Sequence, residues 1–229
     1  MNSAPAVPLT RPMPLVEWLA SAAPIPYRDA LATMEARAAA VIHGAAPECV
    51  WLLEHPPVYT AGTSADRSEL LSPQRFPVYR TGRGGRFTYH GPGQRLAYVM
   101  LDLSARGRDV KAFVASLEDW LITTLALLGV EGERHPGQIG TFVGGAKIAS
   151  IGVRVRHWVS LHGVSLNVDP ELEHFSGIVP CGLKDVAITS LAVLGAETDM
   201  GRVDDALRAA FEEIFAETAL SANDPTRSP

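Results

Sequence analysis

The sequence predicts an α+β fold in which a mixed, largely antiparallel sheet is flanked by helices. Apolar residues recur at helical spacing in three segments, and β-type segments separated by turn residues follow one another between positions 139 and 168. Strands and helices do not alternate regularly, which argues against a doubly wound parallel sheet. We expect one domain over residues 1–229, with loosely ordered ends at about 1–14 and 221–229.

The composition limits the classes of function. Apolar residues make up 47% of the chain and charged residues 20%, so we expect a sizeable core and little disorder. The net charge of −5 argues against a nucleic-acid binder, and two cysteines are too few for a disulfide scaffold. Neither a signal peptide nor a membrane-spanning run is visible. We therefore expect a cytoplasmic protein that uses no membrane.

Three segments have the apolar spacing of helices. The first runs from Tyr27 to Ile42, before Gly44. The second begins after the capping residue Asp109 and runs to about Leu128. The third covers roughly Arg202–Ala219, near the end of the chain. The apolar stripe of the second helix is interpreted as core, not as a cofactor site.

Three strands are predicted in the first half of the chain. Cys49–Leu53 is a short apolar run that ends before two consecutive prolines, and Cys49 is expected to be buried. Val78–Arg80 and Leu96–Leu103 are the next two strands.

Three further strands are predicted to pair antiparallel in sequence order. They are Ile139–Val143, Lys147–Arg156 and Val159–Val168. The turns between them are expected at Gly144-Gly145 and at His157-Trp158.

A glycine-rich segment from Gly82 to Gln94 contains five glycines in thirteen residues. Glycine permits positive φ and a close approach of the backbone to a ligand. Arginines, Thr88, Tyr89 and His90 are interleaved with the glycines and can supply side-chain contacts. The alternative is an ordinary glycine-rich hairpin loop. A dinucleotide site is disfavoured, since Phe87 stands where the third glycine of that motif belongs.

The charges are segregated along the sequence. The stretch from Arg75 to Arg95 contains five arginines and no acid, and Arg134–Val168 also lacks acids. Because solvated faces usually mix both signs, this segregation indicates an anionic partner near these segments.

Lys147 and Cys181 are the strongest candidates for catalysis. Lys147 opens a predicted strand, and Cys181 stands between Pro180 and Gly182, where a loop would present its thiol. A lysine and a thiol can form a base and nucleophile pair. The alternative is a surface lysine and a buried structural cysteine.

The histidines give a weaker signal. His90 either lies near the thiol or stabilises its loop, and His162 on a predicted strand is more often a packed residue. None of the seven histidines stands in metal-ligand spacing, so we predict neither a metal nor a cofactor.

Three blocks of sequence together resemble one family, the lipoyl(octanoyl) transferases. The blocks read R-G-G-R-F-T-Y-H-G-P-G-Q over residues 83–94, K-I-A-S-I-G-V-R-V over 147–155 with H-G-V-S-L-N over 162–167, and I-V-P-C-G over 178–182. The resemblance implies a fold like that of the biotin and lipoate protein ligases. It also implies an acyl-thioester intermediate on Cys181, with Lys147 lowering the barrier to forming the thiolate.

The same resemblance implies which residues bind the acyl substrate. They are Arg83, Gly84, Gly85, Arg86, Phe87, Thr88, Tyr89, His90, Ser150, Ile151, Gly152, Gly163, Val164 and Ser165. One departure from the family pattern is the insertion Gln138-Ile139-Gly140 before the lysine hairpin. This insertion leaves the acyl chain-length preference open.

The family's donor is octanoyl-acyl carrier protein. Its acceptors are the lipoyl domains of 2-oxoacid dehydrogenase E2 subunits and the glycine cleavage H protein. We expect a monomer, since both partners are proteins that need access to the site. The alternatives are an ATP-dependent lipoate or biotin protein ligase of the same fold, which would not need Cys181, and a non-catalytic acyl-binding module.

Overall fold

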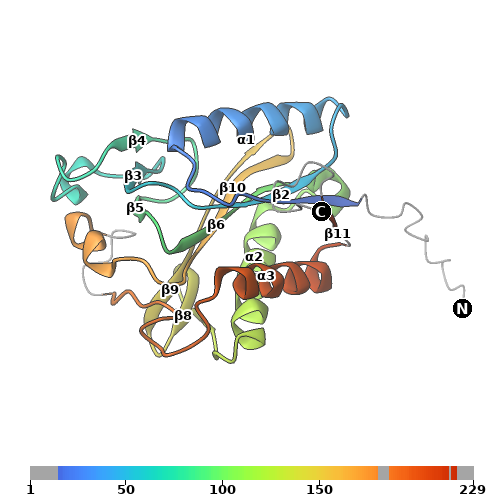
Figure 1. The fold of residues 1–229 in the computed structure, drawn as a ribbon. Helices are drawn as coiled ribbons and strands as arrows, with labels where there is room; N and C mark the ends of the chain where they lie inside the picture. Colours follow the sequence, from blue (N-terminus) through green and yellow to red (C-terminus); the bar gives the residue numbers. More distant parts are fainter. Residues whose placement is uncertain (1–14, 180–185, 217, 221–229) are drawn as a thin grey trace, which may run out of the picture.

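A computed structural model describes residues 15–179, 186–216 and 218–220. Its main element is a mixed eight-stranded sheet with the strand order β11-β1-β2-β6-β10-β9-β8-β7 (Figure 1). In this sheet, β1 pairs parallel with β2 and with β11, and all its other neighbouring strands pair antiparallel. The strands are β1 (Val16–Ala20), β2 (Cys49–Leu53), β6 (Gln94–Met100), β7 (Glu133–His135), β8 (Gln138–Val143), β9 (Ala146–Arg156), β10 (Val159–Asn167) and β11 (Thr218–Leu220).

A second sheet of three strands has the order β4-β3-β5. It consists of β3 (Val58–Ala61), β4 (Val78–Arg80) and β5 (Phe87–His90). Two short 3-10 helices, η1 (Arg67–Glu69) and η3 (Leu172–Gly177), lie on the same side of the molecule (Figure 1). Tyr59 and Phe175 are in the apolar cluster that fills this small lobe.

Helices cover both faces of the large sheet (Figure 1). The first, α1 (Tyr27–Ile42), packs on one face, while α2 (Val110–Leu127) and α3 (Met200–Ile214) pack on the other. Side chains alternate between the two faces of a strand. In β2, Trp51 therefore belongs to the α1 cluster and Leu52 to the cluster of α2 and α3.

The predicted fold class is confirmed, and most predicted elements are present. The helix Tyr27–Ile42 has the predicted bounds, and Asp109 caps α2 by accepting hydrogen bonds from the N–H groups of Lys111 and Ala112. Both predicted turns have positive φ: Gly144 and Gly145 in one, His157 and Trp158 in the other. The predicted loose ends at 1–14 and 221–229 lie outside the described residues.

Two predicted boundaries are wrong. The strand predicted to reach Leu103 ends at Met100, because the Asp102 side chain accepts a hydrogen bond from Ser104 N and caps a 3-10 helix, η2 (Leu103–Arg106). The helix predicted to reach Ala219 ends at Ile214. Residues beyond it instead form β11, whose backbone covers the edge of β1.

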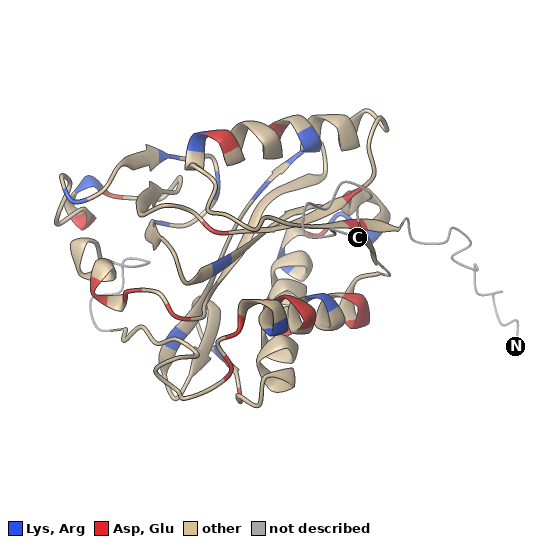
Figure 2. Cartoon of the chain, in the orientation of Figure 1, with Lys and Arg blue, Asp and Glu red and all other residues tan. Residues whose placement is uncertain are grey.

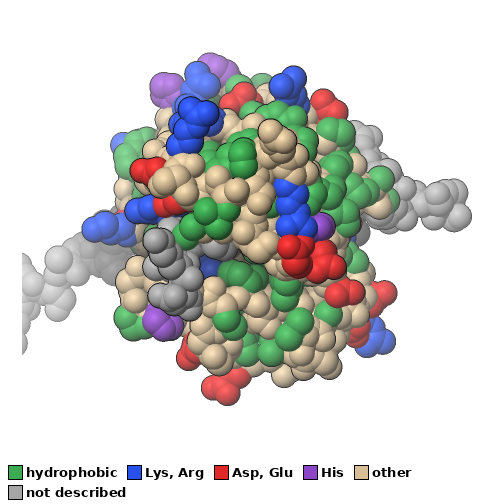
Figure 3. Space-filling model, turned by 90° about the vertical axis from the view of Figure 1, so that its left-hand side faces the viewer, with side chains coloured by type: hydrophobic (Ala, Val, Ile, Leu, Met, Phe, Trp, Pro, Cys, Tyr) green, Lys and Arg blue, Asp and Glu red, His purple; other side chains and the backbone are tan. Residues whose placement is uncertain are grey.

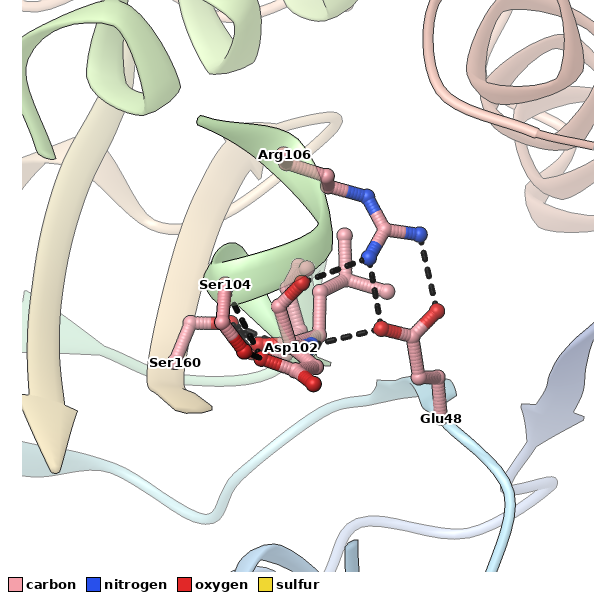
Figure 4. Close-up of polar contacts among 7 residues, drawn as sticks. Glu48, Asp102, Ser104, Arg106 and Ser160 are labelled. Atoms are coloured by element: carbon pink, nitrogen blue, oxygen red, sulfur yellow. Dashed lines mark hydrogen bonds and ion pairs between the residues drawn. The ribbon is translucent and has the colours of Figure 1, made fainter. Parts of the chain in front are cut away.

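A buried ion pair ties the start of β2 to the loop after β6 (Figure 4). The Glu48 carboxylate accepts hydrogen bonds from both terminal nitrogens of Arg106, at 2.5 and 2.7 Å, and from the Asp102 N–H at 2.6 Å. Glu48 is only 4% exposed. Removing one member of such a pair leaves the other charge buried without compensation.

We therefore predict that Glu48→Ala lowers the free energy of unfolding by about 2–4 kcal/mol. Urea unfolding followed by circular dichroism measures this loss. Glu197→Ala is the control, since it removes a half-buried carboxylate that pairs with the exposed Arg202 at 3.1 Å. Equal losses in the two variants would contradict the role assigned to Glu48.

Candidate active site

Residues from distant parts of the sequence line a narrow cleft of about 60 Å³ between the small and the large sheet. Twelve of the predicted substrate-binding residues line it: Arg83, Gly85, Arg86, Phe87, Thr88, His90, Ser150, Ile151, Gly152, Gly163, Val164 and Ser165. The pairing of β9 with β10 places Gly152 opposite Gly163 and Ser150 opposite Ser165, so two of the sequence blocks form one wall.

Two predicted residues do not line the cleft. Gly84 lies behind the wall, where its N–H donates to the Val153 carbonyl at 2.9 Å. The Tyr89 side chain points into the small lobe, and its hydroxyl is 2.8 Å from His174 Nδ1. Neighbouring strand residues face opposite ways, so Thr88 and His90 can face the cleft when Tyr89 does not. Substrate binding by any of these residues stays a prediction.

Five residues that the sequence did not single out as substrate-binding also line the cleft. They are Tyr27, Thr60, Leu96, Tyr98 and His162. They come from α1, β3, β6 and β10, and only the pairing of the strands brings them together. No spacing in the sequence could have grouped them. Tyr27 Oη is buried and makes no hydrogen bond within the described part of the chain, so it is available to a ligand.

Arg83 organises the wall on the small-lobe side. Its guanidinium is buried, and it donates to the carbonyl oxygens of Thr60, Gly84 and Arg86 at 2.9, 2.9 and 3.1 Å. It also donates to Thr60 Oγ1 at 2.8 Å. A Cβ atom at Gly152 would lie 3.0 Å from Arg83 Cδ, so the glycine lets β9 approach the arginine closely.

A directional chain of hydrogen bonds sets the tautomer of His90. Asn167 Nδ2 donates to the Thr189 carbonyl at 2.9 Å, which leaves Asn167 Oδ1 to accept from Gln94 Nε2 at 2.9 Å. Gln94 Oε1 then accepts from His90 Nδ1 at 2.6 Å. A carbonyl can only accept, so the whole chain has one consistent direction. His90 therefore carries its proton on Nδ1 and leaves Nε2 unprotonated.

Three buried histidines lie along the cleft and behind it. His55 donates from Nδ1 to the Ile25 carbonyl at 2.7 Å and accepts from the Tyr98 hydroxyl at Nε2, at 2.8 Å. Burial lowers the pKa of His90 to about 3, helped by the nearby His55, and burial together with Arg83 lowers the pKa of His162 to about 3. Burial also lowers the pKa of His55. All three rings are therefore neutral at pH 7, and they can act as hydrogen-bonding groups without adding charge to the cleft.

Lys147 is buried on β9 with only 3% of its surface exposed. Its Nζ donates to the Ile139 carbonyl at 2.7 Å and lies 5.6 Å from the centre of the Phe142 ring. Its backbone pairs with a later segment: Lys147 N donates to the Ala187 carbonyl at 2.8 Å, and Thr189 N donates to the Lys147 carbonyl at 3.0 Å. The solvated lysine considered as an alternative is excluded.

The predicted nucleophile, Cys181, lies outside the described residues. The chain on each side of residues 180–185 is fixed to the protein. Val179 N donates to the Glu69 carbonyl at 2.8 Å, and Ala187 follows on the other side with its contact to Lys147. The other cysteine, Cys49, is fully buried, and burial raises the pKa of its thiol to about 12. Cys49 is therefore a packing residue, as predicted.

The charge segregation seen in the sequence is largely cancelled by folding. Acids from other segments pair with the arginines: Glu173 with Arg75, Glu69 with Arg86, and Asp204 with Arg95. Figure 2 shows both signs on α1 and on α3. Within the described residues, Arg80, Arg154 and Arg156 make no ion pair and remain able to meet an anionic partner.

The described residues contain neither a metal-binding cluster nor a membrane-spanning helix. No group of three or more histidine, cysteine, aspartate or glutamate side chains there is arranged to hold a metal ion. Among the same residues, no helix is both long and apolar enough to cross a membrane.

The lowered pKa of His162 predicts a pH dependence of stability. Between pH 6.5 and about 3 the unfolded chain binds a proton at this histidine and the folded chain does not, so this contribution is complete above pH 6.5 and is lost as the pH falls. The slope is at most about 1.4 kcal/mol per pH unit. Urea unfolding between pH 7.5 and 5 should therefore show a flatter slope for His162→Asn than for the wild type.

Asparagine is chosen because His162 has a φ of 61°, which asparagine tolerates. His43→Asn is the control, since His43 is exposed. Parallel slopes for the wild type and His162→Asn would show that this histidine is not held neutral by the fold.

Comparison with known proteins places the chain in a family. Residues 26–212 match the model of the lipoyl protein ligase A/B catalytic domain. An octanoyltransferase of Paramagnetospirillum magneticum is 60% identical over 205 residues, which cover 87% of this chain and 97% of that protein. An octanoyltransferase of Parvibaculum lavamentivorans is 58% identical over 207 residues, covering 87% of this chain and 92% of that protein.

Solved structures show the same fold at low identity. A lipoate-protein ligase A bound with ATP superimposes with a TM-score of 0.73 at 15% identity, over 91% of this chain and 88% of the other. A putative lipoate protein ligase from T. acidophilum with bound lipoic acid gives a TM-score of 0.67 at 14% identity, over 91% and 89% of the two chains. The chain therefore belongs to the lipoyl protein ligase A/B catalytic domain family, and within it to the octanoyltransferases.

Proposed function

We propose that this protein transfers an octanoyl group from octanoyl-acyl carrier protein to a lysine of a lipoyl domain, through a thioester on Cys181. The lipoyl domains of 2-oxoacid dehydrogenase E2 subunits and the glycine cleavage H protein are the proposed acceptors. The observation that carries the proposal is the convergence of residues 83–90, 150–152 and 163–165 on one cleft in a member of the octanoyltransferase family.

The first half-reaction exchanges one thioester for another. The Cys181 thiolate attacks the octanoyl carbonyl carbon, a new C–S bond forms, and the bond to the carrier's sulfur breaks. The carrier leaves as a thiolate, which takes up the proton released by Cys181. Because a free thiol has a pKa of about 8.5, the enzyme needs a group that favours its thiolate, and we assign this role to Lys147.

In the second half-reaction the acceptor lysine attacks the thioester as a neutral amine. An amide bond forms, the Cys181–acyl bond breaks, and Lys147 accepts the proton that the amine loses. Exchange between thioesters is nearly balanced in energy, and amide formation from a thioester is downhill. The reaction therefore needs neither ATP nor a cofactor, and we propose that the protein works without them, in the cytoplasm and as a monomer.

Two features of Lys147 support its assignment. A buried amine has fixed hydrogen-bond partners, so its position is defined before substrate arrives. Its backbone also pairs with Ala187, six residues after Cys181 in the sequence.

Intact-mass analysis after mixing the protein with octanoyl-acyl carrier protein tests the nucleophile. We expect the mass to rise by one octanoyl group, and hydroxylamine to remove it, because thioesters react with hydroxylamine. Cys181→Ser should abolish this hydroxylamine-sensitive adduct, whereas Cys49→Ser should keep it. A hydroxylamine-sensitive adduct that survives in Cys181→Ser would show that another thiol carries the acyl chain.

Lys147→Ala should lower the rate of adduct formation by about a hundredfold or more. The same assay with free octanoate and ATP tests the alternative, an ATP-dependent ligase. Product from octanoate and ATP, with none from the carrier thioester, would favour that alternative and exclude our proposal.

Acyl carrier proteins and lipoyl domains are proposed to meet Arg80, Arg154 and Arg156, which are exposed and form no ion pair with the described part of the chain. Most basic side chains on the face in Figure 3 lie in its upper half, where acidic side chains stand among them, and further acidic ones lie below. We expect kcat/KM for the carrier substrate to fall as salt rises, because salt screens attraction between separate charges. Arg80→Glu should lower kcat/KM at low salt and flatten this dependence, whereas the exposed Arg202→Glu on α3 should change neither. Equal salt dependence in all three proteins would exclude steering by Arg80.

A further inference from the structure

One peptide group in β8 makes a hydrogen bond at each of its ends. Its carbonyl, from Ile139, accepts from Lys147 Nζ at 2.7 Å, and its N–H, from Gly140, donates to Glu118 Oε1 at 3.1 Å. The C=O and N–H of a trans peptide point in opposite directions. Glu118 and Lys147 therefore hold the same peptide from opposite sides.

The backbone around this peptide is irregular. Gly140 has a φ of 128°, and the register of β8 against β9 shifts between Thr141 and Phe142. A Cβ atom at Gly140 would lie 2.7 Å from Lys147 Cε and 2.6 Å from the Ala149 carbonyl oxygen. Only glycine fits, because both the dihedral angle and the space exclude a side chain. Ile139 and Gly140 belong to the segment Gln138-Ile139-Gly140, whose departure from the family pattern stays a prediction.

Glu118 is itself held in place. It lies on α2 with a side chain that is 12% exposed, and its second oxygen accepts from Arg134 Nε at 3.1 Å. Arg134 also donates to the Ala115 carbonyl at 2.9 Å and pairs with Asp119 at 2.7 Å. The Glu118 carboxylate is thus fixed on α2, in a position to accept a hydrogen bond from the Gly140 N–H.

We propose that Glu118 is a positioning residue for Lys147, acting through the Ile139–Gly140 peptide. A carboxylate that accepts from an amide N–H forms a charge-assisted hydrogen bond, and it polarises the amide so that the carbonyl at the other end becomes a stronger acceptor. The Ile139 oxygen then holds Nζ in one place. This inference rests on the proposed role of Lys147 in acyl transfer.

Two conservative substitutions separate the effect of the length of the Glu118 side chain from the effect of its charge. Glu118→Asp keeps the charge but shortens the side chain, so the bond to Gly140 N–H is lost. Glu118→Gln keeps the reach and an accepting oxygen but loses the charge. Steady-state transfer from octanoyl-acyl carrier protein to a lipoyl domain, with KM measured for both proteins, provides the test, and thermal unfolding confirms that each variant is folded.

We expect Glu118→Asp to lower kcat by about tenfold or more, with both KM values unchanged, since a displaced catalytic group costs rate and not affinity. Glu118→Gln should stay within about threefold of the wild type, since its amide oxygen can still accept from the Gly140 N–H while the charge and the bond from Arg134 Nε are lost. Hydrogen exchange at the Gly140 amide should speed up in Glu118→Asp and not in Glu118→Gln.

Glu133 offers a matched control in the same hairpin. It is an exposed carboxylate that accepts from the Gly145 N–H at 3.3 Å, at a different peptide from the one that holds Lys147. Glu133→Asp should leave kcat unchanged.

Three results would overturn the inference: wild-type kcat in folded Glu118→Asp, an equal fall in Glu118→Gln and Glu118→Asp, or an equal fall in Glu133→Asp. A Lys147→Ala variant distinguishes failure of the role proposed for Glu118 from failure of the proposed function. If Lys147→Ala is inactive and Glu118→Asp is fully active, only the role of Glu118 is wrong. If Lys147→Ala keeps its rate, the role of Lys147 fails and the inference fails with it.

Discussion

The burial of the Arg83 guanidinium is the constraint on which the cleft depends. A guanidinium is charged at any ordinary pH, so it can be buried only where oxygen atoms surround it. Thr60, Gly84 and Arg86 supply these oxygens, which ties the small sheet to the glycine-rich segment. The same positive charge helps to lower the pKa of His162, so Arg83 also helps to keep this histidine neutral.

Neutral polar groups and apolar side chains make up most of the cleft wall, which suits an acyl chain. A charged group without partners would keep water bound and would disfavour the entry of methylene groups, but the two arginines in the wall, Arg83 and Arg86, are both bonded to protein oxygens. The histidines avoid this cost because each ring is held in a defined tautomer or is too buried to bind a proton. Lys147 is held at the β8 side of the sheet, so the fold separates the group proposed to do chemistry from the wall proposed to hold the substrate.

The sequence predicted the elements that have strong local signals. The helix Tyr27–Ile42 and the hairpins over 138–167 follow from spacing and turn residues, and they were predicted within one or two residues. Five short strands, β1, β3, β5, β7 and β11, were missed, because a short strand is defined by its partners and not by its own pattern. The arginine-rich stretches suggested more unpaired positive charge than the fold contains, for a related reason. Their acidic partners, Glu69, Glu173 and Asp204, are far from the arginines in sequence and adjacent to them in space.

The site was predictable as a list of residues but not as a mechanism. Residue motifs indicated Lys147 and most of the cleft wall, yet a sequence motif cannot show what holds an amine in place. In the structure the amine is held by a backbone carbonyl, which carries no residue-type signal at all. A residue that acts through the backbone, as we propose for Glu118, is therefore invisible to any motif, and its only trace in the sequence is the glycine that the arrangement requires at position 140. The segment Gln138-Ile139-Gly140, which the sequence analysis connected with the acyl pocket, thus supplies the peptide that holds the lysine.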